Sequence, residues 1–416
     1  MTETSASAPT ALTSAVGDDR IRRAAAGDEI AGVLPSWVAS ASSTEEVSAI
    51  LRAADEHGLS VVPKGSGSKL DWGAAPRSAD VLLDVSQLRG VVEHAAGDLV
   101  VTAKAGTPLA EVQAAVSEAG QQLPLDQPLP SATLGGVVAT ATSGPGRHFF
   151  GGVRDLLIGI TVVRADGTVT TAGGKVVKNV AGYDLGKLYT GSYGTLGVIT
   201  EVVFRLHPLA DEHRWIRSVL DGPQEAAETV AALRRCQEMP TAIELDRSEV
   251  DGPITVCAQL EGRPAATHER AVRLAGEIGG EVLERAPEWW GRFPAEPDGN
   301  ALRLGVEPAA LAELLTFAEH AAQDSGVPLT LRGAAGLGVL HAGIPSSCEP
   351  KLLGSLVEGL RQQAEYAVLL RGNPAAREAI DPWGPQPIGV QTLLRRVKDQ
   401  FDPGHRLAPG RFVGGI

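Results

Sequence analysis

The amino-acid sequence predicts an α+β protein with two folded domains. The chain has 416 residues, which is enough for two to three domains. Short apolar runs alternate with Gly-rich turns in residues 31–208, and helix-period segments separate strand-like runs in residues 209–368. The expected order is a disordered Ser/Thr/Ala-rich tail, a first domain, a smaller α+β domain and a C-terminal segment, at residues 1–20, 21–209, 210–385 and 386–416.

Apolar periodicity and turn residues predict the elements of the first domain. Residues 44–57 have apolar side chains at helical spacing behind Thr44, a plausible N-cap, and residues 109–119 predict another helix. Asp166–Gly167 separates two β-rich runs in residues 156–172, so we expect a hairpin with a type I′ turn. Further strands are expected at residues 59–63, 81–85, 99–103 and 198–206.

The second domain is expected to begin near Asp211. Helices are predicted at residues 224–237 and 269–278, and a strand at residues 254–259. Residues 390–412 predict a basic helix followed by FDPGHRLAPGRF.

Composition argues against several classes of protein. The 37 basic and 50 acidic residues give a net charge of −13, and no basic stripe is present, which disfavours nucleic-acid binding. Cys236, Cys257 and Cys348 are scattered, which argues against a disulfide framework, an iron–sulfur site or a zinc site and fits a reducing, cytosolic compartment. No apolar run reaches the ~20 residues of a membrane span, and the N-terminus lacks the pattern of a signal peptide.

The first segment that carries chemistry is PKGSGSK, residues 63–69, which directly follows a predicted strand. Its bare N–H groups and hydroxyls suit a pyrophosphate, although the segment also fits an ordinary Gly/Ser turn. No GxxxxGK[ST] motif occurs in the chain, and no GxGxxG motif opens a helix. A dinucleotide bound here would therefore sit in a fold other than the P-loop or Rossmann fold.

Two further segments are rich in glycine. Small residues fill nearly every position from Gly135 to Gly146, as in a helix that is closely packed or that faces a flat ligand. Residues 173–202 place Lys175, Lys178 and Lys187 between glycines. Such cations are costly to bury unless they are paired, so this loop is either solvated or faces an anionic ligand.

In this order, the three segments resemble the PCMH-type FAD-binding domain of the vanillyl-alcohol oxidase family. VKNVAGYDLGKLYTGSYGTLGVITEV is similar to the matching stretch of the FAD-binding subunits of glycolate oxidases. FDPGHRLAPGRFVGGI, residues 401–416, is similar to the C-terminal end of those subunits. The resemblance covers residues 31–208 and the last 20 or so residues, and only loosely the region between.

The resemblance implies a fold and a cofactor. The fold would be a PCMH-type FAD-binding domain of two α/β subdomains, then a smaller α+β substrate domain, with the C-terminus returning to the FAD domain. The implied FAD-binding residues are Pro63, Lys64, Gly65, Ser66, Gly67, Ser68, Lys69, Leu134, Gly135, Gly136, Ala139, Thr140, Ser143, Gly144, Gly146, Arg154, Asp155, Gly194, Gly197, Val198, Ile199, Pro409, Gly410 and Arg411.

Two departures from the family pattern matter. Ala408 stands where many relatives have Asn before Pro-Gly, so one polar flavin contact would be missing. Relatives with a covalent flavin carry a His in the phosphate loop, and residues 63–69 contain none. We therefore expect non-covalent FAD.

Oxidising a 2-hydroxy acid needs a cation for the carboxylate, a base for the hydroxyl proton and a flavin as hydride acceptor. Lys175 and Lys178 are candidates to stabilise the reduced flavin. Arg332 and Arg371 could clamp the carboxylate, although surface salt bridges explain them equally well. The base candidates are His341 and His148, either of which could instead be structural.

The second domain lacks the metal-binding HxGDGNxH pattern of catalytic relatives, and only GVLHAG around His341 remains. The sequence thus favours the FAD-binding subunit of a glycolate oxidase, with a second FAD subunit and an iron–sulfur subunit as partners, and no metal of its own. It would be cytoplasmic, or held at the membrane face through partners. A stand-alone D-lactate dehydrogenase and a catalytically inert assembly subunit stay open, and a nicotinamide-dependent reductase is less favoured.

Overall fold

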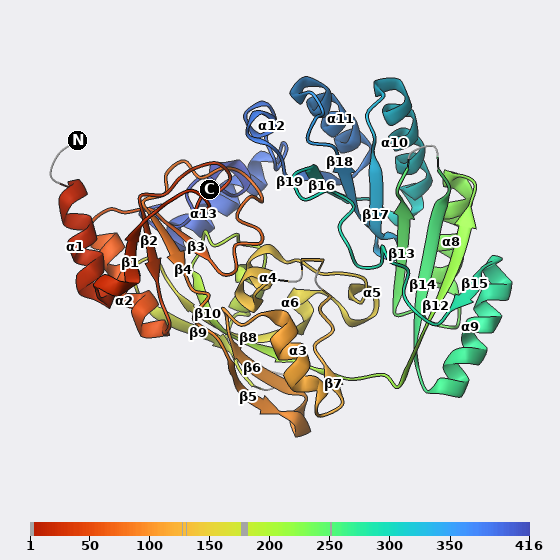
Figure 1. Ribbon diagram of the computed structural model, residues 1–416, viewed down its shortest axis with the longest axis horizontal. Helices are drawn as coiled ribbons and strands as arrows, with labels where there is room; N and C mark the ends of the chain where they lie inside the picture. The colour runs from red at the N-terminus through yellow and green to blue at the C-terminus, as the bar shows by residue number, and fades with distance from the viewer. Residues whose placement is uncertain (1–3, 127, 130, 176–181, 250–251) are drawn as a thin grey trace.

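The computed structural model describes residues 4–126, 128–129, 131–175, 182–249 and 252–416 (Figure 1). At the N-terminus, α1 (Thr4–Val16) packs against α2 (Thr44–Glu56). This corrects the expectation of a disordered tail, because Leu12 is fully buried in the core under α2. The cap of α2 also differs by one position: the Ser43 hydroxyl accepts a hydrogen bond from the Glu46 N–H at 3.1 Å, and Thr44 is the first helical residue.

The first domain contains two sheets. In the four-stranded sheet, the order is β1-β2-β4-β3, and β4 pairs in parallel with β2 and β3. Its strands are β1 (Ile21–Arg23), β2 (Trp37–Ser40), β3 (Val61–Lys64) and β4 (Val81–Asp84). In the antiparallel five-stranded sheet, the order is β5-β6-β10-β8-β9. Its strands are β5 (Val91–Ala95), β6 (Val100–Lys104), β8 (Leu157–Val163), β9 (Val169–Gly173) and β10 (Val198–Arg205).

The turn between β8 and β9 is not the predicted type I′ turn. The N–H of Gly167 donates to the Arg164 carbonyl at 2.9 Å, and the N–H of Arg164 donates to the Thr168 carbonyl at 3.0 Å. Gly167 has a φ of +78°, whereas Asp166 does not have a positive φ. A type I′ turn needs positive φ at both central residues. In this longer loop, a positive φ at Gly167 alone is enough to close the hairpin.

Short helices connect these sheets, and a small pair of strands lies beside them. They are α3 (Leu109–Ser117), α4 (Leu134–Thr140), α5 (Arg147–Phe150), α6 (Val153–Leu156), α7 (Leu185–Tyr189), β7 (Gln121–Gln122) and β11 (His207–Pro208). The run of small residues from Gly135 is helical only as far as Thr140, because Ala141 takes a left-handed conformation with φ +50°. The rest of that run is a loop that leads to α5.

The second domain is an antiparallel sheet of eight strands with helices on one face. The strand order is β15-β12-β14-β13-β17-β18-β16-β19. The strands are β12 (Glu212–Leu220), β13 (Ala242–Arg247), β14 (Ile254–Gly262), β15 (Glu281–Leu283), β16 (Asn300–Gly305), β17 (Thr330–Ala334), β18 (Val339–Ile344) and β19 (Tyr366–Arg371). The covering helices are α8 (Pro223–Arg235), α9 (Pro264–Ile278), α10 (Leu311–Ser325) and α11 (Pro350–Gln363), which Figure 1 shows on the side away from the first domain.

Alternation along the strands gives this sheet one apolar and one polar face. Leu245, Leu331 and Leu340 are buried in the core beneath the helices. Side chains alternate between faces along a strand, so the neighbours of these leucines point toward the first domain. Cross-strand pairing aligns them in one row, in the order Asp246, Arg332, His341 and Arg303.

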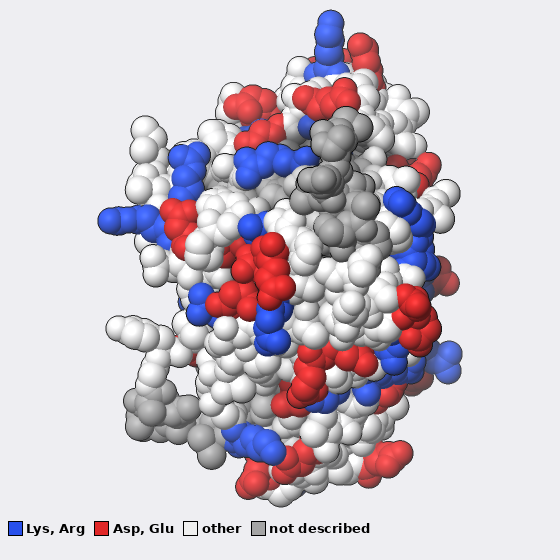
Figure 2. Space-filling view, turned by 90° about the vertical axis from the view of Figure 1, so that its left-hand side faces the viewer, with Lys and Arg blue, Asp and Glu red and all other residues white. Residues whose placement is uncertain are grey.

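The C-terminal segment returns to the first domain, as Figure 1 shows. After α12 (Pro374–Ala379) and α13 (Ile388–Phe401), Leu407 pairs with Val61 of β3 in a parallel bridge. In the described part of the chain, no helix is both long and apolar enough to cross a bilayer. On the face seen in Figure 2, acidic and basic side chains are interspersed, and the described basic residues form no continuous stripe there.

Candidate functional site

A cavity of about 740 Å³ lies in the first domain where its Gly-rich loops meet. Three stretches form its walls: residues 63–70 at the end of β3 and in the loop after it, residues 133–140 at the N-cap of α4 and along that helix, and residues 193–199 before and within β10. Val85, Ala105 and Arg411 complete the lining. The described lining contains no histidine or cysteine. Of the residues implied for FAD, the lining includes all of Pro63–Lys69 with Gly135, Gly136, Ala139, Thr140, Gly194, Gly197, Val198, Ile199 and Arg411.

Two glycines explain why these loops can approach one another so closely. A Cβ on Gly65 would overlap Thr133 Oγ1, the N-cap oxygen of α4. Gly194 has a φ of +75°, and a Cβ there would lie 2.6 Å from Pro63 Cγ. A larger residue at Gly65 would clash with its neighbour. A larger residue at Gly194 would clash and would also have to adopt a positive φ, which only glycine does readily. The walls are thus built of exposed main chain, a surface that suits a dinucleotide.

Lys69 supplies a buried cation to this cavity. The residue is 7% exposed, and its Nζ lies 3.5 Å from Ser68 Oγ and over the ring of Trp72. Burial lowers the pKa of Lys69 to about 8. Among the described residues it pairs with no carboxylate, whereas Lys64 pairs with Asp84 at 3.3 Å. A buried ammonium without a counter-ion is costly, so an anionic group such as the FAD pyrophosphate fits beside Lys69.

Arg411 closes the cavity from the C-terminal segment. Its guanidinium donates to the carbonyls of Leu70 at 2.9 Å and Trp72 at 2.7 Å, and burial lowers its pKa to about 10. Pro409 and Gly410 do not line the cavity; the Pro409 carbonyl instead accepts from the Arg77 N–H at 2.8 Å. Pro409 and Gly410 form the turn that places the Arg411 side chain at the cavity.

A second cleft of about 610 Å³ lies between the two domains and shares Thr140 with the first cavity. One wall is the loop at residues 140–147, which includes the predicted Ser143 and Gly144. The opposite wall is the polar face of the eight-stranded sheet, with Glu244, Arg303 and His341. Trp72, Phe293 and Leu370 provide apolar lining.

Arg147 and Arg303 give this cleft a strongly positive character. They come from the two opposite walls. Burial lowers the pKa of Arg147, and the charge of Arg303 lowers it further. Within the described ranges neither guanidinium forms an ion pair; Arg303 lies 6.0 Å from the centre of the Tyr366 ring. Two like charges that face a cleft without a partner form a site for an anion.

Glu244 and His341 are the titratable groups of the cleft that are not arginines. Glu244 is 3% exposed, and its Oε1 accepts no hydrogen bond from any described residue. Burial raises the pKa of Glu244 well above its usual value. Removal from water, and secondly the charge of Arg303, lower the pKa of His341 to about 3. His341 is therefore neutral at physiological pH and a weak base.

The other predicted catalytic residues lie elsewhere. Arg332 does not line the cleft, because its Nε donates to Asp246 at 2.6 Å and this bond turns it along the sheet. Arg371 donates to the carbonyls of Gly299, at 2.9 Å, and Glu296. Lys175 is exposed and pairs with Glu93, and Lys178 is outside the described residues. His148 does not line the cleft; it packs beside Gly336, with its pKa lowered by burial.

Besides Pro409 and Gly410, four residues implied for FAD line neither space. Leu134 is fully buried in the core of the first domain, and Arg154 is exposed. Asp155 accepts a hydrogen bond from the Gly152 N–H at 2.9 Å and thus caps α6. Gly146 donates its N–H to Asp126 at 2.6 Å. Of these residues, Gly146 belongs to the loop that carries Ser143 and Gly144, and its bond to Asp126 helps to hold that loop.

Sequence reasoning missed Arg147, Glu244, Arg303 and Tyr193. The last lines the first cavity, and burial raises its pKa to about 12. A signal existed for two of them, since Glu244 and Arg303 each stand between aliphatic residues in a strand, in AIELDR and ALRLG. A charged residue in such alternation must face something other than the core. Arg147 and Tyr193 gave no comparable signal.

Comparison with known proteins supports an FAD-binding first domain. The FAD binding domain family matches residues 35–173. Glycolate oxidase subunit GlcD of Bacillus subtilis is 32% identical over 51% of this chain and 45% of its own length. Subunit GlcE of Escherichia coli is 44% identical over 36% of this chain and 42% of its own length. This chain therefore spans less than half the length of either curated subunit.

One relative matches nearly end to end. An uncharacterised FAD-linked oxidoreductase of Mycobacterium tuberculosis is 32% identical over 91% of this chain and 91% of its own length. The chain belongs to the FAD-linked oxidoreductases. Their cofactor, FAD, is therefore also that of this protein.

The fold of this FAD-linked oxidoreductase is of the predicted PCMH type. The solved structure of 4-ethylphenol oxidase from Gulosibacter chungangensis superposes with a TM-score of 0.76 over 99% of this chain and 97% of that one, at 16% identity. The likeness thus extends over both domains and the C-terminal segment. At this identity it concerns the fold alone.

Proposed function

We propose that this FAD-linked oxidoreductase oxidises a small 2-hydroxy acid, glycolate in the first instance, to the 2-oxo acid. FAD would occupy the cavity lined by residues 63–70, with its pyrophosphate beside Lys69. The substrate would occupy the adjoining cleft. The observation that carries the proposal is the pair Arg147 and Arg303, which face the cleft without a carboxylate partner among the described residues. Such a pair suits the carboxylate of a hydroxy acid.

FAD supplies the chemistry that amino-acid side chains lack, namely acceptance of a hydride. The chain's own residues bind and orient the substrate. The guanidinium groups of Arg147 and Arg303 hold the carboxylate, while Trp72, Phe293 and Leu370 exclude water from the hydroxyl end. A 2-hydroxy acid held at both its carboxylate end and its hydroxyl end has one orientation in the cleft.

Glu244 is the group that we propose to take the hydroxyl proton. It lines the cleft, and its Oε1 is a buried acceptor without a hydrogen-bond donor among the described residues. A base works best when its pKa is near the working pH. Burial raises the pKa of Glu244 well above its usual value, whereas the pKa of His341 falls to about 3, far below the working pH.

We further propose that the chain is the FAD-binding subunit of a larger complex. Its similarity to GlcD and GlcE supports two FAD-containing chains that act together. Cys236, Cys257 and Cys348 are far apart in the sequence, so an iron–sulfur cluster would belong to a partner. A stand-alone D-lactate dehydrogenase is the second candidate, since the same pair of arginines would hold lactate equally well.

Anaerobic reduction of the flavin tests the proposal. The purified chain, reconstituted with FAD, is mixed with glycolate, D-lactate, L-lactate or ethanol, and the absorbance of the oxidised flavin is followed. We expect a hydroxy acid, but not ethanol, to bleach the flavin. Bleaching by D-lactate alone would favour the second candidate. If no hydroxy acid bleaches the flavin even with partner chains present, the chain is an assembly subunit and the proposal is wrong.

A further inference from the structure

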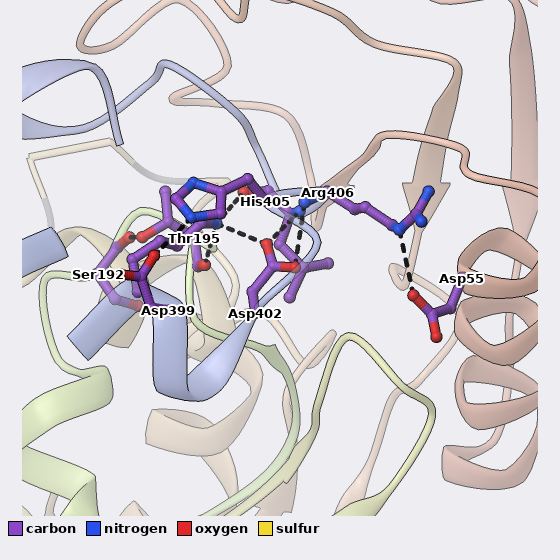
Figure 3. Close-up of polar contacts among 9 residues, drawn as sticks. Asp55, Ser192, Thr195, Asp399, Asp402, His405 and Arg406 are labelled. Carbon is purple, nitrogen blue, oxygen red and sulfur yellow. Dashed lines mark hydrogen bonds and ion pairs between the residues drawn. The ribbon is translucent and has the colours of Figure 1, made fainter. Parts of the chain in front are cut away.

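A fully buried ammonium group lies in the C-terminal segment, outside both the cavity and the cleft. Lys398, in α13, is 0% exposed. Its Nζ donates to the Thr195 carbonyl at 2.7 Å, to Asp402 Oδ2 at 2.6 Å and to the Leu407 carbonyl at 2.9 Å. An ammonium has three protons to donate, so all three are used. Figure 3 shows Thr195 and Asp402, which come from two separate segments, close to one another.

One of these bonds reaches a wall of the FAD cavity. Thr195 lies between Tyr193, Gly194 and Gly197, all of which line the cavity. The same loop carries positive φ at Tyr193 and Gly194, at +55° and +75°. At Tyr193, which is not a glycine, such a conformation persists only where its surroundings hold it. The Lys398 bond to the Thr195 carbonyl is one of the contacts that hold this loop.

The other bonds reach a second wall of the cavity. Leu407 pairs with Val61, the Val61 N–H donates to the Arg406 carbonyl at 2.8 Å, and the Ala408 N–H donates to the Val61 carbonyl at 2.8 Å. Val61 begins β3, which leads directly into the lining residues from Pro63 onward. Asp402 fixes this turn by accepting from the N–H groups of Arg406 at 3.1 Å and Leu407 at 2.7 Å.

We propose that Lys398 is a positioning residue for FAD, because its ammonium ties the 193–199 wall of the cavity to the 63–70 wall. It touches neither substrate nor cofactor. The loop at residues 63–70 and the loop at residues 193–199 belong to different sheets, and Gly194 of one presses on Pro63 of the other. Lys398, which does not line the cavity, fixes the spacing of the two loops through its bonds to Thr195 and Leu407. The inference rests on the proposed placement of FAD and is independent of the proposed substrate.

The test is FAD affinity of the reconstituted full-length apoprotein, with Lys398→Met as the main variant. We expect FAD to bind at least tenfold more weakly, which corresponds to about 1.4 kcal/mol, and the visible circular dichroism of the bound flavin to change. Asp402→Asn keeps the volume and one acceptor, so we expect a smaller loss. If Lys398→Met does not fold, Asp402→Asn decides by the same two measurements.

Two controls separate positioning from general stability and from the placement of FAD. Glu238 is a buried carboxylate in the second domain that pairs with Arg270 at 3.3 Å and Arg273 at 3.1 Å. Glu238→Gln should lower the urea midpoint but leave FAD affinity and dichroism unchanged. Lys69→Met, inside the cavity, should weaken FAD binding. Wild-type affinity and dichroism in the Lys398 variant would overturn the inference, and an unaffected Lys69 variant would overturn the placement of FAD instead.

Discussion

At the scale of single residues, the cleft depends on charges that interrupt apolar strands. Glu244 and Arg303 occupy positions whose neighbours, Leu245 and Leu302, are buried under the helices. Their own side chains consequently point to the opposite face, where they line the cleft. The alternation in these strands therefore indicates this half of the cleft, whereas the sequence candidates for a carboxylate clamp, Arg332 and Arg371, do not line it.

Arg303→Met should weaken binding of the substrate carboxylate. Hydrogen bonds to charged groups contribute about 1.5–3 kcal/mol, so we expect a roughly ten- to hundredfold higher dissociation constant. Oxalate, an unreactive dicarboxylate, can be titrated against the flavin spectrum to measure this. The exposed Arg285 offers a charge-matched control, and Arg285→Met should leave oxalate binding unchanged. Equal affinity in both variants would contradict the assignment of Arg303.

Glu244→Gln should slow flavin reduction by about 10²–10⁴-fold, the usual contribution of a positioned base. The wild-type rate should rise with pH, because Glu244 keeps its proton up to its raised pKa and can accept another only after losing it. The glutamine variant should lack this rise. Stopped-flow reduction across pH measures both effects. His341→Asn serves as the control, since a group with a pKa of about 3 does not titrate in the working range.

At the scale of elements, regular patterns were predicted well and local turn chemistry less well. The helix at residues 44–57 and the strands around residues 81–85 and 198–206 agree with α2, β4 and β10 to within one residue at either end. The N-cap of α2 is Ser43, one position before the predicted Thr44. The turn at Gly167 is of another type than the predicted type I′ turn. These details depend on one or two hydrogen bonds, which apolar periodicity does not report.

The first helix was missed because its sequence, rich in Ser, Thr and Ala, carries little amphipathic signal. Its position depends on Leu12, which is fully buried. Leu12→Ala should lower the free energy of unfolding by about 2–5 kcal/mol, the usual cost of such a truncation in a core. Urea denaturation measures this. Ser14→Ala, at an exposed position of the same helix, should change it little, and a similar small effect at Leu12 would show that α1 does not pack as described.

At the scale of the whole molecule, the meeting of the Gly-rich segments in one cavity could be predicted and the cleft could not. Gly-rich segments at residues 63–69 and 191–199 are recognisable because close backbone approach demands glycine at positions such as Gly65 and Gly194. The cleft arises only when the loop at residues 140–147 meets a sheet that forms about a hundred residues later in the chain. The spacing of residues in the sequence does not show that this loop and this sheet face each other.

The cavity also predicts how the cofactor is held. Its described lining contains neither histidine nor cysteine, and it presents main chain, Lys69 and Arg411 to a bound group. We therefore expect acid precipitation to release all of the yellow colour into the supernatant. Absorbance at 450 nm of supernatant and pellet measures this. Colour that stays with the pellet after washing would show a covalent link.

The contribution of Arg411 to this cavity has a consequence for biosynthesis. Arg411 closes a pocket whose other lining residues all lie between residues 63 and 199. A ribosome makes proteins from the amino end, so these residues are synthesised long before Arg411. The pocket should accordingly be complete only once Arg411 has been made, and a chain stopped before residue 411 should hold its flavin more weakly.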